Sequence, residues 1–279
     1  MPKEILSPTQ PLRIASLQPS ITLTLERIGK LDALVACTRY CVEALPELRK
    51  LPLTIIADSW STNMEELIAV QPNLVIASVP YRMESLAAIL RAGCPVLTLA
   101  PHTLADILAD IRLLAAVVHA SERGDALVEE IVSGIETVRA QAAACPNRPR
   151  VYCEEWGKPL IHSQPWVKEL VEAAGGEFVG DAGKTTTAAE VASLDPDVLI
   201  FAWCGAGARV PLARVVEQRG WQDLRAVVEG RVYCVPDEFL NTPAHTLLAG
   251  LACLASAIHP KIFPLHRQLI SRAPSRKQA

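Results

Sequence analysis

The chain has 279 residues, half of them apolar, which is enough to fill one large hydrophobic core or two modest ones. With 27 basic and 30 acidic residues its formal net charge is −3, so it lacks the basic surface of a nucleic-acid-binding protein. No stretch reaches the roughly 18 to 20 apolar residues that cross a bilayer. The N-terminus also lacks the charged start, apolar core and cleavage site of a secretory signal. We therefore expect a globular protein that does not span a membrane and is cytoplasmic if this is the full native chain.

The eight cysteines are scattered along the sequence. Cys37 and Cys41 form the nearest pair, but their spacing is not that of a CxxC redox motif, and no second pair completes a zinc site. Several others lie in apolar stretches, where a reduced thiol packs as a small hydrophobic group. The sequence therefore predicts reduced, structural cysteines.

One pattern occurs twice, as NMEELIAVQPNLVIAS at 63–78 and TAAEVASLDPDVLIFAW at 187–203. Each copy begins as a helix with a polar capping residue and acidic residues near its positive N-terminal end. Pro72 and Pro196 then end the helices, because proline has no N–H and forces the preceding residue out of the helical region. The unbroken apolar runs that follow are typical of parallel strands covered on both faces. The repeat indicates that the chain is built from two similar halves.

The remaining elements follow from apolar periodicity and from Gly and Pro positions. In the first half we expect strands at 12–17, 34–38, 74–77 and 95–99, helices at 21–28 and 84–92, and a long loop at 38–62. A helical stretch from 103 is followed by a second helix at 121–144, about 36 Å long at about 1.5 Å per residue. In the second half we expect strands at 150–153, 198–201 and 231–235, and helices at 166–176, 212–218 and 243–258.

This order predicts an α/β fold of two similar Rossmann-like lobes with parallel sheets, joined by one long linking α-helix. The expected boundaries are 12–120 for the N-terminal lobe, 121–145 for the linking helix and 147–266 for the C-terminal lobe.

Aromatic side chains follow several predicted strands, although only 5% of the chain is aromatic. Ligands of parallel α/β sheets bind beyond the carboxyl ends of the strands, so these residues are candidate contacts for a broad, partly apolar ligand. They are Tyr40, Trp60, Tyr81, Trp156, Trp203 and Phe239. The alternative is that some of them pack within a lobe, and Trp166 and Trp221, in or next to helices, fit that alternative better.

His102, His162 and His245 also lie near predicted loop ends or helix starts. Each is able to hydrogen-bond a ligand or ligate a metal, but no HExxH or similar pair is present, and a lone histidine is more often an ordinary polar residue. We predict no metal site.

The sequence contains no catalytic motif that stands out. The segment 205–207, Gly-Ala-Gly, follows a strand, but GxGxxG is incomplete and no P-loop lysine follows. A GxSxG elbow is absent. Glu154 and Glu155 are adjacent on a predicted strand, so their side chains point to opposite faces. We therefore predict a protein that is not an enzyme and has no catalytic residues.

Taken together, Gln18-Pro19-Ser20 after a strand, Tyr40, Trp60 just before NMEEL, the two repeats and the single long helix resemble a known family. The chain is similar over about residues 12–260 to the substrate-binding proteins of ABC importers for vitamin B12, haem and iron siderophores. The segment CEEWGKPLIHSQPWV resembles its cobalamin-binding branch. The resemblance implies two α/β lobes on a helical backbone, a ligand cleft between the lobes with little hinge closure, and a periplasmic or cell-surface location.

The resemblance further implies a non-catalytic protein that binds a corrinoid and needs no cofactor beyond this bound ligand. The expected ligand-binding residues are Pro19, Tyr40, Trp60, Tyr81, Trp156, His162, Trp203 and Phe239. Two alternatives remain open. One is a haem or ferric-siderophore binding protein, and the other is a cytosolic corrinoid-handling factor or enzyme on the same fold.

Members of this family dock on an ABC permease through one glutamate per lobe near the start of the repeated helix. Glu65 matches this position in the first lobe. In the second lobe Ala189 takes the equivalent place and Glu190 comes one residue later, which turns its side chain by about 100° around the helix. Ser78 also stands where the cobalamin branch can carry a tryptophan. We expect Glu65 and Glu190 to be the docking residues, with the second less well aligned.

Overall fold

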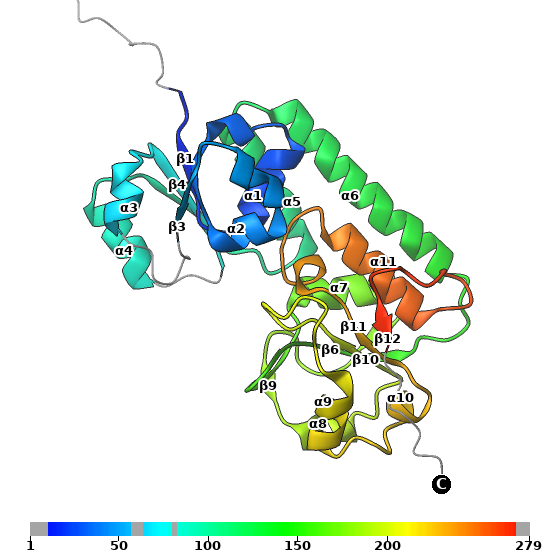
Figure 1. Cartoon of the computed structure of the whole chain (residues 1–279). Helices are drawn as coiled ribbons and strands as arrows, with labels where there is room; N and C mark the ends of the chain where they lie inside the picture. The colour runs from blue at the N-terminus through cyan, green and yellow to red at the C-terminus, as the bar shows by residue number, and fades with distance from the viewer. Residues whose placement is uncertain (1–10, 57–63, 80–82, 272–279) are drawn as a thin grey trace, which may run out of the picture. The chain divides into compact units, whose positions relative to one another are not determined.

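A computed structural model of the chain describes residues 11–56, 64–79 and 83–271. Its contacts divide the chain into two compact units, residues 1–101 with 105–128 and residues 102–104 with 129–279. Helix α6 (Ser121–Ala142) contains the boundary, and its 22 residues confirm the predicted long helix. Each unit has its own sheet, and Figure 1 shows helices on both faces of each.

The first unit contains a five-stranded sheet in the order β3-β2-β1-β4-β5. Its strands are β1 (Ile14–Ser16), β2 (Leu34–Thr38), β3 (Thr54–Ile56), β4 (Leu74–Ser78) and β5 (Val96–Leu99). All the pairings between them are parallel, as predicted. The helices of this half of the chain are α1 (Pro19–Arg27), α2 (Arg39–Ala44), α3 (Met64–Ala69), α4 (Met83–Arg91) and α5 (Leu104–Val117).

The buried strand β4 shows why the apolar runs predicted the sheet correctly. Val75, Ile76 and Ala77 are all fully buried, so both faces of the strand are covered. Helices α3 and α4 lie on one face of the sheet and α1 and α2 on the other (Figure 1). Polar alternation would be out of place in such a strand.

The prediction of a loop over 38–62 was wrong for its described part. Helix α2, a 3₁₀ helix at Pro46–Lys50 and strand β3 occupy most of 39–56. The Thr38 side chain accepts a hydrogen bond from the Cys41 N–H and caps α2, while Cys41, Val42 and Leu48 are buried. The prolines of this segment favoured the prediction of a loop, whereas buried apolar side chains hold short helices and a strand in place.

The second unit has a mixed sheet in the order β12-β11-β10-β6-β7-β9, with β8 paired to β6. Its strands are β6 (Arg150–Gly157), β7 (Leu160–His162), β8 (Glu177–Phe178), β9 (Thr185–Thr186), β10 (Val198–Phe201), β11 (Val232–Cys234) and β12 (Ile270–Ser271). The centre, β8-β6-β10-β11, is parallel as predicted, whereas β7, β9 and β12 pair antiparallel. Strand β6 is longer than expected because it continues to Gly157 and turns back into β7 at Lys158 and Pro159.

Helices α7 and α11 cover one face of this sheet, and α8 and α9 cover the other (Figure 1). The helices of the second unit are α7 (Pro165–Ala173), α8 (Ala188–Ser193), α9 (Leu212–Arg219), α10 (Arg225–Val228) and α11 (Leu247–Ile258). Between α8, α9 and the sheet lies a buried apolar cluster that contains Tyr152, Phe201 and Trp221. The Tyr152 ring packs edge-to-face against the other two rings. Trp203 packs against this cluster.

All eight cysteines are free, and five of them are buried, as predicted for structural thiols. Within residues 11–56, 64–79 and 83–271, no helix combines the length and the apolar character required to cross a membrane.

Candidate functional site

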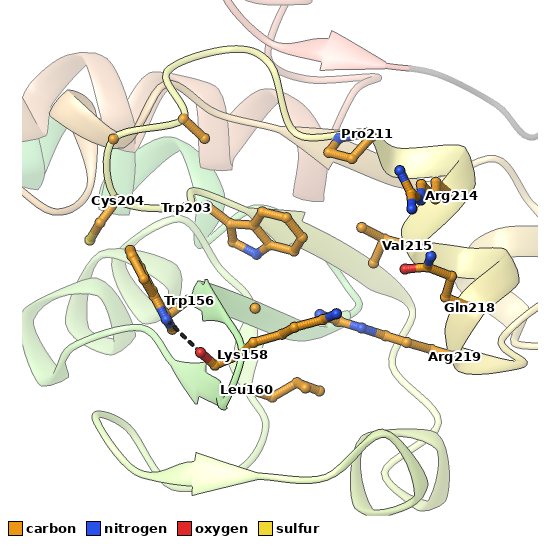
Figure 2. Close-up of a pocket in the computed structure, with 13 residues that line it drawn as sticks. Trp156, Lys158, Leu160, Trp203, Cys204, Pro211, Arg214, Val215, Gln218 and Arg219 are labelled. Atoms are coloured by element: carbon orange, nitrogen blue, oxygen red, sulfur yellow. Dashed lines mark hydrogen bonds between the residues drawn. The ribbon is translucent and has the colours of Figure 1, made fainter.

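A pocket of about 740 Å³ opens in the second unit at the carboxyl ends of β6 and β10. Figure 2 shows the two indoles on one side of it and side chains of α9 on the other. Its lining consists of Trp156, Gly157, Lys158, Leu160, Trp203, Cys204, Gly205, Ala206, Pro211, Arg214, Val215, Gln218 and Arg219. This is the position at which parallel α/β sheets bind ligands, and the volume is typical of a small-molecule site.

The two indoles are held in different ways. Trp203 is half-buried, and its Nε1–H donates a 2.7 Å hydrogen bond to Glu154 Oε1. Trp156 is 43% exposed and donates from Nε1 to the Lys158 carbonyl oxygen at 2.8 Å. Gly157 allows the Trp203 ring to approach, because a Cβ there would lie 2.6 Å from a ring carbon. The pocket thus presents one fixed indole and one that is accessible to a ligand.

A buried ion pair forms the base of the pocket. The Arg219 guanidinium donates to both carboxylate oxygens of Glu154, at 2.7 and 2.8 Å, and the two side chains are 9% and 0% exposed. The Tyr152 hydroxyl also donates a hydrogen bond to this carboxylate, at 2.5 Å, which with the bond from Trp203 makes four. Burial, followed by the Glu154 charge, raises the pKa of Tyr152, so its hydroxyl stays protonated and remains a donor.

Aromatic rings surround the buried guanidinium. Arg219 Cζ lies 4.8 Å from the centre of the Trp221 ring, 5.7 Å from that of Phe201 and 5.9 Å from that of Trp203. Cation–π contacts of this kind stabilise a desolvated guanidinium. Arg219, Glu154 and Trp203 therefore form one connected group, and its charges are balanced internally.

Glu155 and Glu154 bind different partners, although they are adjacent on β6. Its Oε1 accepts a 2.6 Å hydrogen bond from Gln164 Nε2. Burial raises the pKa of Glu155 to about 7, although the hydrogen bond from Gln164 acts in the opposite direction. The two carboxyls are thus separate groups rather than an acid/base pair.

The Gly205-Ala206-Gly207 turn does not offer its N–H groups to a phosphate. The carboxylate of Asp237 accepts from the N–H of Gly205 and from that of Gly207, each at 2.8 Å. The turn is stabilised by this internal carboxylate and forms one wall of the pocket.

Pro19 and Tyr40 lie where the sequence predicted, beyond the carboxyl ends of β1 and β2 in the first unit. Pro19 is the first residue of α1, and Tyr40 is the second residue of α2. Tyr40 Oη accepts a 2.9 Å hydrogen bond from Arg39 Nη2, and the guanidinium lies 4.8 Å from the centre of the Tyr40 ring. Trp60 and Tyr81 lie outside the described residues.

Phe239 and His162 are not among the residues that line the pocket. Phe239 is 9% exposed and lies in the 3₁₀ helix at Asp237–Phe239. His162 is 3% exposed, with its ring 5.2 Å from the Tyr152 ring centre and 6.2 Å from that of Phe178. Burial lowers the pKa of His162, which favours the neutral ring. Both positions are those of interior residues in this unit.

The placement of Trp166 and Trp221 agrees with their predicted packing role. Trp166 is 4% exposed and donates from Nε1 to the Leu240 carbonyl oxygen, and Trp221 is 1% exposed. The basic residues of the pocket were not predicted from the sequence. Lys158, Arg214 and Arg219 come from a hairpin turn and a helix face, and no motif brings these positions together.

No group of three or more His, Cys, Asp or Glu side chains suited to a metal ion occurs in the part of the chain that the structure describes.

The two proposed docking glutamates differ by one helical position. Glu65 is the second residue of α3, whereas Glu190 is the third residue of α8, and both are exposed. Glu190 also closes a capping box, because its carboxylate accepts from the Thr187 N–H at 2.8 Å and from Thr186 Oγ1 at 3.0 Å. These hydrogen bonds lower the pKa of Glu190, and the bond from Thr186 has the largest effect.

Residues 14–239 match the family described as periplasmic binding protein, and the chain belongs to this family. Among curated relatives, a cobalamin-binding protein of Halobacterium salinarum is 24% identical over 267 residues, which covers 90% of this chain and 70% of the relative.

Solved structures show the same fold. A periplasmic heme binding protein from Pseudomonas aeruginosa matches with a TM-score of 0.83 at 20% identity, covering 94% of this chain and 98% of the other. The periplasmic vitamin B12 binding protein of Vibrio cholerae matches with a TM-score of 0.71 at 22% identity, covering 88% and 96%. At 20–22% identity these matches support the fold alone, so the ligand must be inferred from the residues of the site.

Proposed function

We propose that this protein binds a corrinoid, a cobalamin-like ligand, without chemical conversion and delivers it to an ABC importer. One observation carries the proposal: two indoles flank a pocket of about 740 Å³ at the carboxyl ends of β6 and β10. A corrin ring presents a broad, partly apolar face, and indoles supply large contact area with few rotamers to immobilise. The 24% identical cobalamin-binding relative supports the same ligand class.

A binding role also fits the chemistry of the pocket. Glu154 is committed to Arg219 and Trp203, and Asp237 to the Gly205-Ala206-Gly207 turn. Neither carboxylate is therefore placed to act as a general base on a bound molecule. Holding a ligand through contact area and fixed polar groups requires no such base.

Fluorescence titration of the full chain with cyanocobalamin tests the proposal. The corrin absorbs at the wavelengths where tryptophan emits, so binding next to Trp156 and Trp203 is expected to quench the emission to a saturating plateau. An emission that declines only as the absorbance of added ligand dictates, with no plateau up to high micromolar concentration, contradicts it.

Haem is the second candidate, and Tyr40 is the observation that favours it. A phenol oxygen is a known axial ligand of haem iron, and Arg39 donates a 2.9 Å hydrogen bond to this one. An absorption scan of the purified protein separates the candidates, since bound haem gives an intense Soret band that a corrinoid lacks. Addition of haemin followed by a Tyr40→Phe comparison would then show whether the phenol ligates iron.

For delivery to the importer, Glu65 and Glu190 remain our proposed contacts with the permease. Their exposure supports the role. The capping box turns the Glu190 carboxylate toward its own helix start, so we propose that Glu65 contributes more to docking.

A further inference from the structure

The lining of the pocket in the second unit is basic as well as aromatic. Lys158, Arg214 and Arg219 are among its residues, and no Asp or Glu is. The chain as a whole carries a formal net charge of −3, so this local excess of positive charge is not a consequence of overall composition.

Arg219 does not contribute free charge, because its guanidinium forms a bidentate pair with the fully buried Glu154. Such a pair is electrically neutral from the viewpoint of a ligand. The surrounding rings of Trp203 and Trp221 also occupy the faces of the guanidinium. Arg219 is therefore a structural part of the pocket.

Lys158 and Arg214 differ from Arg219 in both respects. Each is exposed, and within the described ranges of the chain neither ammonium nor guanidinium forms an ion pair. Besides Glu154, which is paired with Arg219, two carboxylates bind segments next to the pocket: Glu155 accepts from Gln164 and has a raised pKa, and Asp237 binds two backbone N–H groups. The positive charges of Lys158 and Arg214 are therefore available to bind a ligand that enters the pocket.

We infer that the ligand of this pocket carries an acidic group, which Lys158 and Arg214 bind while the Trp156 and Trp203 indoles contact its apolar face. This inference rests on the proposed function and specifies the chemistry that the ligand must bring. A guanidinium and an ammonium together suit an anionic oxygen group, because charge-assisted hydrogen bonds are roughly twice as strong as neutral ones.

Two sources of such a group are compatible with the site. Cobalamin carries a phosphodiester in its nucleotide loop, and haem carries two propionates at one edge of its ring. Both place the acidic group beside a broad apolar macrocycle, which matches the side-by-side arrangement of indoles and cations in Figure 2. The phosphodiester and the propionates are distinguished by comparing the binding of cyanocobalamin, dicyanocobinamide and haemin.

The test uses the full chain with the double substitution Lys158→Gln and Arg214→Gln. The matched control is Lys168→Gln with Lys184→Gln, which removes the same charge from exposed residues of the second unit that do not line the pocket. Dissociation constants are measured for cyanocobalamin, for dicyanocobinamide, which lacks the phosphodiester, and for haemin, each at two salt concentrations.

We expect the pocket variant to weaken cyanocobalamin binding by about tenfold or more, while the control stays within about twofold of the unchanged chain. The loss should be much smaller for dicyanocobinamide, and the salt dependence of cyanocobalamin binding should fall in the pocket variant alone. Equal losses in the pocket and control variants, or equal losses for the two corrinoids, overturn the inference.

The haemin measurement keeps this inference distinct from the corrinoid proposal. If the unchanged chain binds haemin and not cyanocobalamin, the corrinoid proposal fails, and a tenfold loss of haemin affinity in the pocket variant supports a carboxylate as the acidic group. Haemin affinity that is equal in the pocket and control variants then overturns the inference. Binding of neither compound by the unchanged chain contradicts both.

Discussion

Glu154 is the central residue of the pocket, because its carboxylate holds three side chains in place. It accepts two hydrogen bonds from Arg219, one from Trp203 and one from Tyr152, and it is fully buried. Removing one partner from a buried ion pair is costly, since the other charge then remains desolvated and unpaired. We conclude that Glu154 makes the pocket rigid before a ligand arrives, which limits the entropy lost on binding.

Trp156 allows the role of an indole in binding to be tested without disturbing the core. Its side chain is 43% exposed, so Trp156→Ala should cost little stability. We expect the variant to weaken cyanocobalamin binding by about 1–2 kcal/mol, or roughly 5- to 30-fold, as for an aromatic anchor. Calorimetry measures the change, and Val228→Ala, which removes another exposed apolar side chain of this unit, is the control. An unchanged affinity in Trp156→Ala would exclude this indole from the site.

Glu155 gives a prediction for the pH dependence of stability. Burial raises its pKa from 4.5 to about 7 in the folded chain, so the folded state holds a proton that the unfolded state releases. The stabilisation that this proton provides is complete below the unfolded pKa and is lost as the pH rises through about 7. Glu155→Gln keeps an amide oxygen that can accept from Gln164 and cannot titrate.

Between about pH 5 and pH 8 the unchanged protein should therefore lose about 1–3 kcal/mol more unfolding free energy than Glu155→Gln does. Urea denaturation at the two pH values measures the difference. Parallel pH profiles for the two proteins would show that the Glu155 carboxyl is no more buried than in the unfolded chain.

At the scale of elements, the repeated helix-proline-strand segment explains how much the sequence could predict. Strand β10 begins and ends where its apolar run predicted, and β4 begins at the predicted Leu74 and ends one residue later than predicted, because a strand buried on both faces leaves no polar alternation. The antiparallel strands β7, β9 and β12 were not predicted, since they contain two or three residues each and depend on tertiary pairing. The same limit applies to the pocket, where the indoles were predicted from their strand ends and the basic residues were not.

The second copy of the repeat provides a prediction for helix capping. Thr187 Oγ1 accepts from the Glu190 N–H at 3.2 Å, and Thr187→Ala leaves that N–H without its partner at the start of α8. We expect the substitution to lower the unfolding free energy by about 1 kcal/mol, measured by chemical denaturation. Glu190→Gln is the matched variant, because glutamine also completes a capping box, and it should lose less. A larger loss in Glu190→Gln would mean that the charge of Glu190, rather than the cap, stabilises the helix.

The whole chain consists of two compact units, each with its own sheet. The first sheet is parallel throughout, and the second is parallel at its centre. The predicted duplication accounts for this architecture, and the family match over residues 14–239 spans both units. The two sheets nevertheless differ, since the second adds antiparallel edges and the β6–β7 hairpin that carries Trp156 and Lys158. The pocket lies in the second unit, next to the hairpin that the first sheet lacks.

Calorimetric titration of the full chain with cyanocobalamin, with haemin titrated in parallel, tests the corrinoid-binding role most directly. We expect saturable binding of one cyanocobalamin per chain with a micromolar or lower dissociation constant, tighter than that of haemin. The absence of heat beyond dilution at high micromolar cyanocobalamin, or preferential binding of haemin, would contradict it.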